Sequence, residues 1–410
     1  MLFVEVTIEK VVAGGLGLTR VEGRVALVEG ALEGERVEAA EALQDSRATL
    51  LRMRTVRVLE ASPDRVRAQE LPTADLAHAS YAAQLRYKRG FVQEALERIG
   101  RMEGEVGPTR PSPQQWAYRT ALQYALFEGR LAYRERGSHL LRTFNQDPLA
   151  VQAVQEFTAR LNPEKLVGLE ELVLRASFHT GEVLAAIVAA GDKDEYAEVT
   201  EHLLEAGAVG VSLSAPGERR FARGSHLLAG QDTVLERYGQ LDLSVSAVGF
   251  AQVNPAAASE LYLEAAELAG QGHQALDLYG GAGALGLHLA DRYRRVTVLD
   301  ISKEALRRGR ADAERLGIRN VEFARGDALR LPYGVDTVVV DPPRAGLGAE
   351  VRDALLRSDA SRLVYVSCDP ATWARDVGDL ARRGFQLVSV TPWDFYPQTA
   401  HVEVLSLLER

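Results

Sequence analysis

The chain has 410 residues, more than one ordinary domain contains, so we expect two or three domains. Hydrophobic residues make up 46% of the chain and charged residues 26%, values that exclude disordered and fibrous proteins. The formal net charge of −9, from 48 basic and 57 acidic residues, indicates that the whole molecule is not a general polyanion binder. No stretch approaches the ~18 unbroken apolar residues of a membrane helix, and the first residues lack a signal-peptide layout. We therefore expect a cytoplasmic protein, monomeric and without a membrane partner.

Residues 1–60 predict short strands. Val4, Val6 and Ile8 alternate with polar residues, and the glycines that follow from residue 14 are typical of a turn. The pattern suits a small β-barrel of the oligonucleotide-binding kind.

A helix is predicted over 81–100, where apolar residues recur near helical spacing and Gly100 provides a C-terminal stop. Residues 61–245 mix strands and helices without a recognisable chemical motif. We expect a central α+β domain there that contacts RNA, with its segment near 78–104 packed on the domain that follows.

From residue 246 to 410, strands alternate with helices. The predicted strands are 275–279, 296–300, 321–324, 337–340, 363–367, 387–391 and 402–408, and the predicted helices are 255–269, 285–293, 303–316, 349–356 and 371–383. This alternation predicts a doubly wound α/β catalytic domain, with ligands at the carboxyl ends of its strands.

Two segments are locally basic. Residues 47–67 hold six arginines against two acids, and residues 86–142 hold eleven basic residues against six acids. Solvated surfaces carry such runs as readily as phosphate-binding surfaces do, and only five of the 48 basic residues are lysine, which a general arginine bias explains equally well.

A glycine loop follows the strand 275–279. Gly281, Gly283 and Gly286 spell G-x-G-x-x-G before a helix, and Asp300 ends the next strand. This pattern predicts a nucleotide cofactor whose ribose hydroxyls meet a carboxylate, and by itself it leaves NAD and S-adenosylmethionine equally open.

Polar residues follow other strands of the same domain. Asp341 precedes two prolines, which stiffen the backbone and present the carboxylate at the mouth of the sheet. Asp327 is expected either to bond the adenine edge of the cofactor or to cap a turn.

Cys368 is the one cysteine, so an intramolecular disulfide, a paired-cysteine zinc site and an iron–sulfur cluster are excluded, and we expect no metal. Most lone cysteines are buried and inert. This one follows the end of strand 363–367 beside Ser367 and Asp369, which favours a presented thiol. A nucleophilic role requires a positive neighbour or activation in the complex.

Near the C-terminus, His401 and Glu403 lie two residues apart at the start of a strand. The valines on either side of Glu403 predict a raised carboxyl pKa that suits proton abstraction, although a surface glutamate on an edge strand is an open alternative. His401 is expected to orient or pack.

Taken together, these segments resemble the RNA uracil-C5 methyltransferases, which make 5-methyluridine in ribosomal or transfer RNA. The resemblance rests on VEVTIEKVVAGGLGLTRVEG from residue 4, like the family's TRAM barrel, and on GFAQVN (249–254), LDLYGGAG (276–283), DPPRAG (341–346), YVSCDPAT (365–372) and FYPQTAHVE (395–403).

The resemblance implies a class I methyltransferase fold and S-adenosylmethionine as cofactor. It implies Cys368 as nucleophile and Glu403 as base. The implied cofactor residues are Gln252, Tyr279, Gly281, Gly283, Asp300, Asp327 and Asp341, and the implied substrate residues are Phe250, Asp341 and Arg344. Whether Asp341 meets the base or the cofactor first stays open.

The chain departs from the family pattern in the region 71–80, where many members carry iron–sulfur cysteines and this chain has none. Gly280 and Ala284 stand where members often have Cys and Asn, and Asp300 replaces the commoner Glu. The barrel favours ribosomal over transfer RNA by analogy, and 23S rRNA is the expected partner. A cytosine-C5 methyltransferase, an NAD-dependent oxidoreductase and a non-catalytic RNA-binding protein remain as alternatives.

Overall fold

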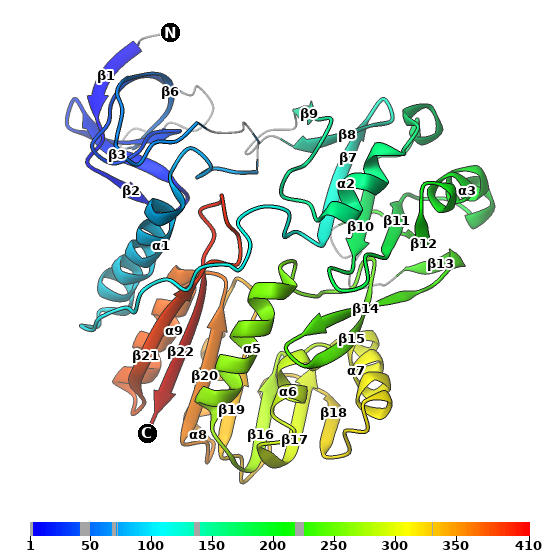
Figure 1. Ribbon diagram of the computed structural model, residues 1–410. Helices are drawn as coiled ribbons and strands as arrows, with labels where there is room; N and C mark the ends of the chain where they lie inside the picture. The colour runs from blue at the N-terminus through cyan, green and yellow to red at the C-terminus, as the bar shows by residue number, and fades with distance from the viewer. Residues whose placement is uncertain are drawn as a thin grey trace. The chain divides into compact units, whose positions relative to one another are not determined.

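The computed structural model describes residues 3–41, 50–67, 71, 73–134, 140–217, 225–329 and 331–410. The chain divides into two compact units (Figure 1). The first unit comprises Met1–Gln115, Cys368–Asp379 and Ser389–Val404, and the second comprises Trp116–Ser367, Leu380–Val388 and Leu405–Arg410. The domain boundaries near residues 60 and 245 stay predictions.

The first unit begins with a six-stranded sheet in the order β1-β5-β6-β4-β3-β2. Its strands are β1 (Phe3–Thr7), β2 (Lys10–Val12), β3 (Leu16–Val21), β4 (Arg24–Glu29), β5 (Arg36–Glu41) and β6 (Leu50–Glu60). Strands β4 and β6 pair in parallel, and the other neighbouring strands of this sheet pair antiparallel. The alternation predicted near the start is observed, because Val6 and Ile8 are buried in the apolar core while Glu5 is exposed.

Helix α1 (Tyr81–Ala95) follows in the same unit. The Ser80 side chain caps it by accepting a hydrogen bond from the Ala83 amide, and a π-helical turn, η1 (Leu96–Gly100), extends it. Arg101 has a left-handed φ of 54°, so the helix stops where the sequence predicts.

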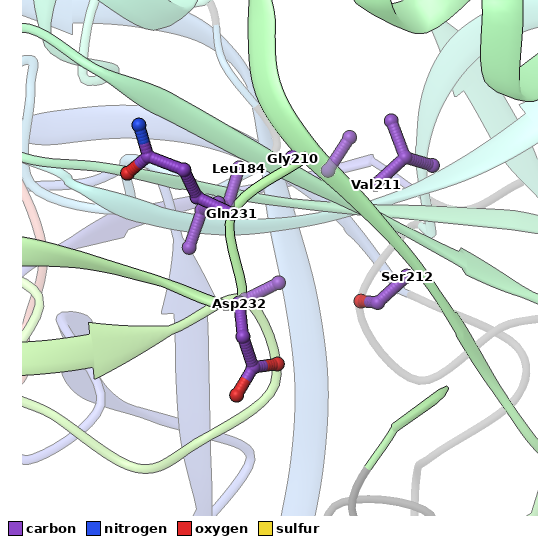
Figure 2. Close-up of a pocket in the computed structure, with 8 residues that line it drawn as sticks. Leu184, Gly210, Val211, Ser212, Gln231 and Asp232 are labelled. Atoms are coloured by element: carbon purple, nitrogen blue, oxygen red, sulfur yellow. The ribbon is translucent and has the colours of Figure 1, made fainter. Parts of the chain in front are cut away.

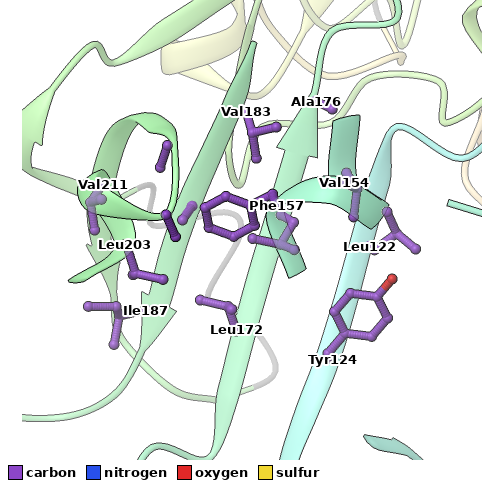
Figure 3. Packing of buried hydrophobic residues seen from close by; sticks show 14 of the residues in the cluster. Leu122, Tyr124, Val154, Phe157, Leu172, Ala176, Val183, Ile187, Leu203 and Val211 are labelled. Carbon is purple, nitrogen blue, oxygen red and sulfur yellow. The ribbon is translucent and has the colours of Figure 1, made fainter. Parts of the chain in front are cut away.

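The second unit contains a seven-stranded sheet in the order β13-β12-β11-β10-β7-β8-β9. Its strands are β7 (Ala121–Phe127), β8 (Arg130–Arg134), β9 (Leu141–Thr143), β10 (Glu171–Ala176), β11 (Val183–Val188), β12 (Ala208–Ser214) and β13 (His226–Gly230), and the helical segments are α2 (Gln152–Ala159), η2 (Pro163–Leu166), η3 (Lys193–Tyr196) and α3 (Ala197–Glu205). Phe157 of α2 and Leu203 of α3 lie in its apolar core (Figure 3). The hairpin β14 (Thr233–Tyr238) and β15 (Leu241–Ser246) leads to helix α5 (Pro255–Ala269).

The last sheet has the order β18-β17-β16-β19-β20-β22-β21. Its strands are β16 (Gly272–Leu278), β17 (Tyr293–Asp300), β18 (Val321–Arg325), β19 (Thr337–Val340), β20 (Arg362–Ser367), β21 (Gln386–Trp393) and β22 (Glu403–Glu409), and its helices are α6 (Ala284–His288), α7 (Lys303–Arg315), α8 (Ala349–Arg357) and α9 (Pro370–Arg382). The strands from β18 to β20 pair in parallel. The strand order reverses between β16 and β19, and ligands of open α/β sheets bind at such a switch point.

One predicted helix is wrong. The helix expected over 285–293 ends at His288, and Tyr293 is instead the first residue of β17. Tyr293 is buried there, and its hydroxyl donates to the Thr337 hydroxyl at 2.9 Å, which fixes the residue against the neighbouring strands.

Candidate active site

The glycine loop joins β16 to α6 in the second unit. Tyr279, Gly281 and Gly283 have φ values of 63°, 56° and 80°. A Cβ added at Gly283 would lie 2.7 Å from the Phe323 ring, whereas one added at Gly281 would meet no atom within 4 Å. The loop is therefore packed on one side and open at Gly281, as a cradle for a ligand requires.

Asp300, at the end of β17, lies against this loop. One carboxylate oxygen accepts a hydrogen bond from the Gly281 amide at 3.0 Å, and the other accepts from the Ser302 amide at 2.7 Å. The side chain is half-buried, and the contact with ribose hydroxyls expected from the sequence stays a prediction.

Asp327 follows β18 and is exposed. Its carboxylate accepts a hydrogen bond from the Leu329 amide at 3.2 Å. In this structure Asp327 therefore caps a turn, which is the second of the two roles expected for it.

A buried carboxylate beside the glycine loop that the sequence analysis did not single out is Asp277, near the end of β16. It is buried and accepts a hydrogen bond from the Gly286 amide at 2.8 Å, so it holds α6 to the strand. The pKa of Asp277 is raised to about 7, mainly by burial and also by the charges of Asp341 and Asp300, against the lowering effect of the Gly286 amide. The sequence feature that could have identified Asp277 is an acidic residue within an otherwise apolar strand.

Asp341 is the first residue after β19 and is half-buried. Gln252 donates from Nε2 to Oδ2 of Asp341 at 3.4 Å, so the structure brings these two predicted residues together. Burial raises the pKa of Asp341 to about 7, although the bond from Gln252 lowers it. Near neutral pH the group is therefore able to donate as well as accept a hydrogen bond.

A buried arginine holds the loop that carries Phe250. Arg175 of β10 donates to the Gly249 carbonyl at 2.9 Å and to the Ala251 carbonyl at 3.5 Å. Phe250 lies between these two carbonyls with 86% of its surface exposed, so the loop is fixed while the ring faces solvent. Arg344, the other predicted substrate residue, is also exposed.

In the first unit, Cys368 follows the end of β20 directly. It is half-buried rather than sealed in an apolar core. The Asp369 carboxylate accepts hydrogen bonds from the Ala371 and Thr372 amides, both at 2.9 Å, and thereby caps helix α9. Cys368 thus lies at the N-terminal end of a helix.

Strand β22 runs antiparallel to β20. Three contacts establish its register: Arg410 N donates to Ser361 O at 3.0 Å, Arg362 pairs with Glu409 at 2.6 Å, and Ser406 Oγ donates to Tyr365 O at 3.4 Å. Each step forward along β22 corresponds to one step back along β20. Extension of this register to the start of β22 places Glu403 across from Cys368.

Glu403 is 1% exposed. His401, two residues earlier, is half-buried and makes an edge-to-face contact with Tyr396, whose ring centroid is 5.7 Å away. His401 therefore packs against an aromatic ring, which is one of the two roles expected for it.

Three of the six arginines of the basic segment 47–67 form ion pairs. Arg54 lies 3.9 Å from Glu29, Arg57 lies 3.4 Å from Glu38, and Arg65 pairs with the buried Glu35. Acids of other strands thus offset the local excess of positive charge. Arg47 lies outside the described residues.

A hollow of about 140 Å³ lies in the second unit between β11, β12 and Asp232 (Figure 2). It does not admit a water-sized sphere, so it is a packing gap and not a binding site. Among the described residues there is no group of three or more His, Cys, Asp or Glu placed to hold a metal ion. No helix in the described part of the chain is long and apolar enough to cross a membrane.

Comparison with known proteins adds two family matches. Residues 321–410 match the family model described as tRNA (Uracil-5-)-methyltransferase, and residues 275–354 match a methyltransferase domain.

Full-length relatives are similar over nearly the whole chain. An uncharacterised RNA methyltransferase of Halalkalibacterium halodurans is 32% identical over 99% of this chain and 96% of its own length. Another from Thermosynechococcus vestitus is 31% identical over 99% of this chain and 97% of its own length. Among solved structures, the Pyrococcus abyssi tRNA (uracil-54, C5)-methyltransferase in complex with S-adenosyl-L-homocysteine has a TM-score of 0.76 and 26% identity, with 99% of this chain and 100% of that chain covered.

Proposed function

The chain belongs to the RNA uracil-C5 methyltransferase family, and on that premise we propose that it methylates C5 of a uridine in 23S ribosomal RNA through a covalent bond between Cys368 and C6. It is an S-adenosylmethionine-dependent enzyme with a class I methyltransferase fold. The proposed mechanism is supported by the antiparallel register of β20 and β22, whose extension to the start of β22 brings the Cys368 thiol across from the buried Glu403 carboxylate.

Uracil C5 is a poor carbon nucleophile, so the reaction needs added electron density. Attack of the Cys368 thiolate at C6 forms an S–C6 bond and turns the ring into an enolate with its negative charge shared by C5 and O4. S-adenosylmethionine, held by the glycine loop and Asp300, would supply an electrophilic methyl group to C5 and would leave as a neutral thioether. Glu403 then removes the C5 proton, the C5=C6 double bond re-forms, and the thiolate leaves.

Two features suit Cys368 to this role, because one stabilises its thiolate and the other leaves the thiol accessible. Cys368 lies at the N-terminal end of α9, where the helix dipole stabilises an anion. The site is also half-open to a base that has left its stack, which a uridine must do to reach the thiol.

Asp341 and Gln252 are proposed to orient the uracil ring. The raised pKa of Asp341 keeps a proton available near neutral pH, and the amide of Gln252 can bond a ring carbonyl. Phe250 is exposed and is proposed to stack on a base. Arg344 is proposed to contact RNA phosphate.

The residues of the glycine loop fit the methyl donor. The open space at Gly281 admits the ligand, Asp300 is placed for ribose hydroxyls, and Tyr279 borders the same loop. Asp327 keeps a carboxylate oxygen available beyond its turn-capping bond.

Cys368→Ser tests the nucleophile. The variant should bind S-adenosylhomocysteine as the wild type does and form no 5-methyluridine. RNA containing 5-fluorouridine should trap wild-type protein covalently on a denaturing gel, with a mass adduct on the peptide that holds Cys368. Full turnover by Cys368→Ser would remove the mechanism.

Glu403→Gln tests the base. With methyl donor and ordinary RNA, this variant should accumulate covalent protein–RNA complex and release little product. Glu409→Gln, on the same strand, serves as the matched control and should turn over normally. Unchanged product formation by Glu403→Gln would reassign the proton-abstracting role.

Transfer RNA is the second candidate substrate, because the Pyrococcus abyssi neighbour acts on tRNA uracil-54. Unmodified transcripts of 23S rRNA and of tRNA, each incubated with enzyme and digested for mass spectrometry, separate the two. Methylation of tRNA alone would overturn the ribosomal assignment.

A further inference from the structure

The segment 394–402, which leads into Glu403, is held by elements from the start of the chain, and all of these elements belong to the first unit. We call it the approach segment. Phe395, Gln398 and Thr399 are 1–3% exposed although the segment has no regular secondary structure. Irregular backbone buried to this degree needs specific partners for its polar groups.

Helix α1 supplies one set of partners. Gln84 accepts a hydrogen bond from the Gln398 amide at 2.8 Å and donates from Nε2 to the Gln398 side-chain oxygen at 2.9 Å. Gln398 has a φ of 70°, a left-handed conformation that costs free energy for a residue with a side chain. The two bonds from Gln84 therefore hold the approach segment in a conformation that it would not keep alone.

The turn that precedes α1 and the N-terminal sheet supply the rest. The Leu76 amide donates to the Gln398 carbonyl at 2.9 Å, and the Ala400 amide donates to the Asp75 carboxylate at 3.4 Å. Gly15, in the turn between β2 and β3, lies against the approach segment. A Cβ added to Gly15 would lie 3.2 Å from the Ala400 Cβ and 3.3 Å from Leu76 Cδ2. Lys10 of β2 is in turn paired with Glu94 of α1.

From these contacts we propose that Gly15 and Gln84 are positioning residues for Glu403, so that the N-terminal sheet and α1 form part of the proton-abstraction machinery as well as a surface for RNA. The inference rests on the role proposed for Glu403. Ala400 lies three residues before Glu403, so a shift of Ala400 is expected to move the Glu403 carboxylate. A displacement of about 1 Å in a reacting group lowers a rate by as much as ~100-fold.

The test exploits two adjacent glycines. Gly15→Ala and Gly14→Ala both place a side chain at a positive φ, 73° and 90°, and so carry a similar backbone strain. The Cβ at position 14 would meet only Leu16 Cδ1 at 4.0 Å, whereas the Cβ at position 15 presses on the approach segment. A difference between the two variants therefore reports the contacts with Ala400 and with Leu76, which itself bonds to Gln398.

Gln84→Met forms a second, independent test with Gln93→Met as its control. Both residues lie on α1, but Gln93 bonds to Glu97, Gly104 and Val106 and not to the approach segment.

Each full-length variant is incubated with S-adenosylmethionine and transcripts carrying tritium at uridine C5. The assay measures tritium release, methyl transfer in the first turnover and the fraction of protein bound covalently to RNA. For Gly15→Ala and Gln84→Met we expect first-turnover methyl transfer within about twofold of wild type, tritium release slowed roughly 10- to 100-fold, and accumulated covalent complex. Gly14→Ala and Gln93→Met should match the wild type.

Two outcomes would overturn the inference, and each differs from failure of the proposed mechanism. Equal behaviour of Gly15→Ala and Gly14→Ala, with Glu403→Gln still accumulating complex, would show that the approach segment does not position the base. Parallel loss of methyl transfer and tritium release would show a general structural effect. A Glu403→Gln variant that accumulates no complex would instead refute the proposed function.

Discussion

Lys88 of α1 and Asp394 form an ion pair in which both side chains are fully buried. Lys88 also donates to the Tyr396 carbonyl at 3.0 Å, so one ammonium group binds both a side chain and the backbone of the approach segment. Burial lowers the pKa of Lys88, and the charge of Asp394 opposes that shift.

Removal of one partner of this pair should be costly. Lys88→Met leaves Asp394 as an uncompensated buried charge, which lowers the free energy of unfolding by roughly 3–5 kcal/mol. Urea denaturation followed by fluorescence measures the change. The double variant Lys88→Met with Asp394→Leu should recover most of the loss, and a double variant as unstable as the single one would contradict this account.

Asp277 should make the protein less stable as pH rises. Its folded pKa of about 7 lies above the value of 3.8 for an aspartate in the unfolded chain, so the folded state binds more protons than the unfolded state between these pH values. Stability therefore falls as pH increases through that range, by up to about 4 kcal/mol. Asp277→Asn keeps an acceptor for the Gly286 amide and removes the free-energy cost of ionising a buried carboxyl group.

We expect Asp277→Asn to be more stable than wild type at about pH 8 and to show a flatter pH dependence, since the neutral amide has no proton to lose. Urea midpoints at several pH values give the comparison. An unchanged slope of stability against pH would contradict the assignment. Asp327→Asn, which alters an exposed carboxylate, serves as the control.

Gly309 of α7 makes room for the glycine loop. A Cβ there would lie 2.4 Å from the Ala282 carbonyl oxygen and 2.3 Å from the Phe323 ring. Alanine favours helices over glycine, yet the clash with backbone should dominate, so Gly309→Ala should destabilise the protein by about 1–3 kcal/mol. It should also weaken binding of S-adenosylhomocysteine in calorimetry.

Gly348→Ala is the matched control, because a Cβ at that position would meet nothing within 4 Å. It should leave stability and binding close to wild type. Equal affinity in both variants would show that the loop tolerates the displacement.

The paired arginines of β6 should limit RNA binding by the N-terminal sheet. Glu29→Gln combined with Glu38→Gln frees Arg54 and Arg57 for phosphate. We expect tighter binding of a 23S rRNA transcript and a slope of log K against log salt that is steeper by about 1.5.

A control pair, Glu22→Gln with Glu33→Gln, removes the same charge from nearby turns. Filter binding at several salt concentrations distinguishes the two pairs. Identical slopes would mean that only net charge matters and that Arg54 and Arg57 do not meet RNA.

The features that depend on neighbouring residues were predictable from the sequence. The glycine loop, Asp300 at the end of β17 and Cys368 after β20 each follow from a strand and the turn next to it. The pairs Gln84–Gln398 and Lys88–Asp394 join residues 314 and 306 positions apart, and nothing local marks either partner. Sequence reasoning also counted the charges of 47–67 within that segment, whereas the structure pairs them with acids from other strands.

The reversed direction of β22 also affects how firmly the proposed base is held. In a parallel sheet, ligands bind at the edge formed by the carboxyl ends of the strands. Residues that follow those ends usually lie on loops. A strand of opposite direction begins at that edge, so Glu403 stands on hydrogen-bonded backbone with few side-chain conformations open to it. The backbone of the proposed base is therefore fixed by the sheet, and the target uridine has to be brought to it.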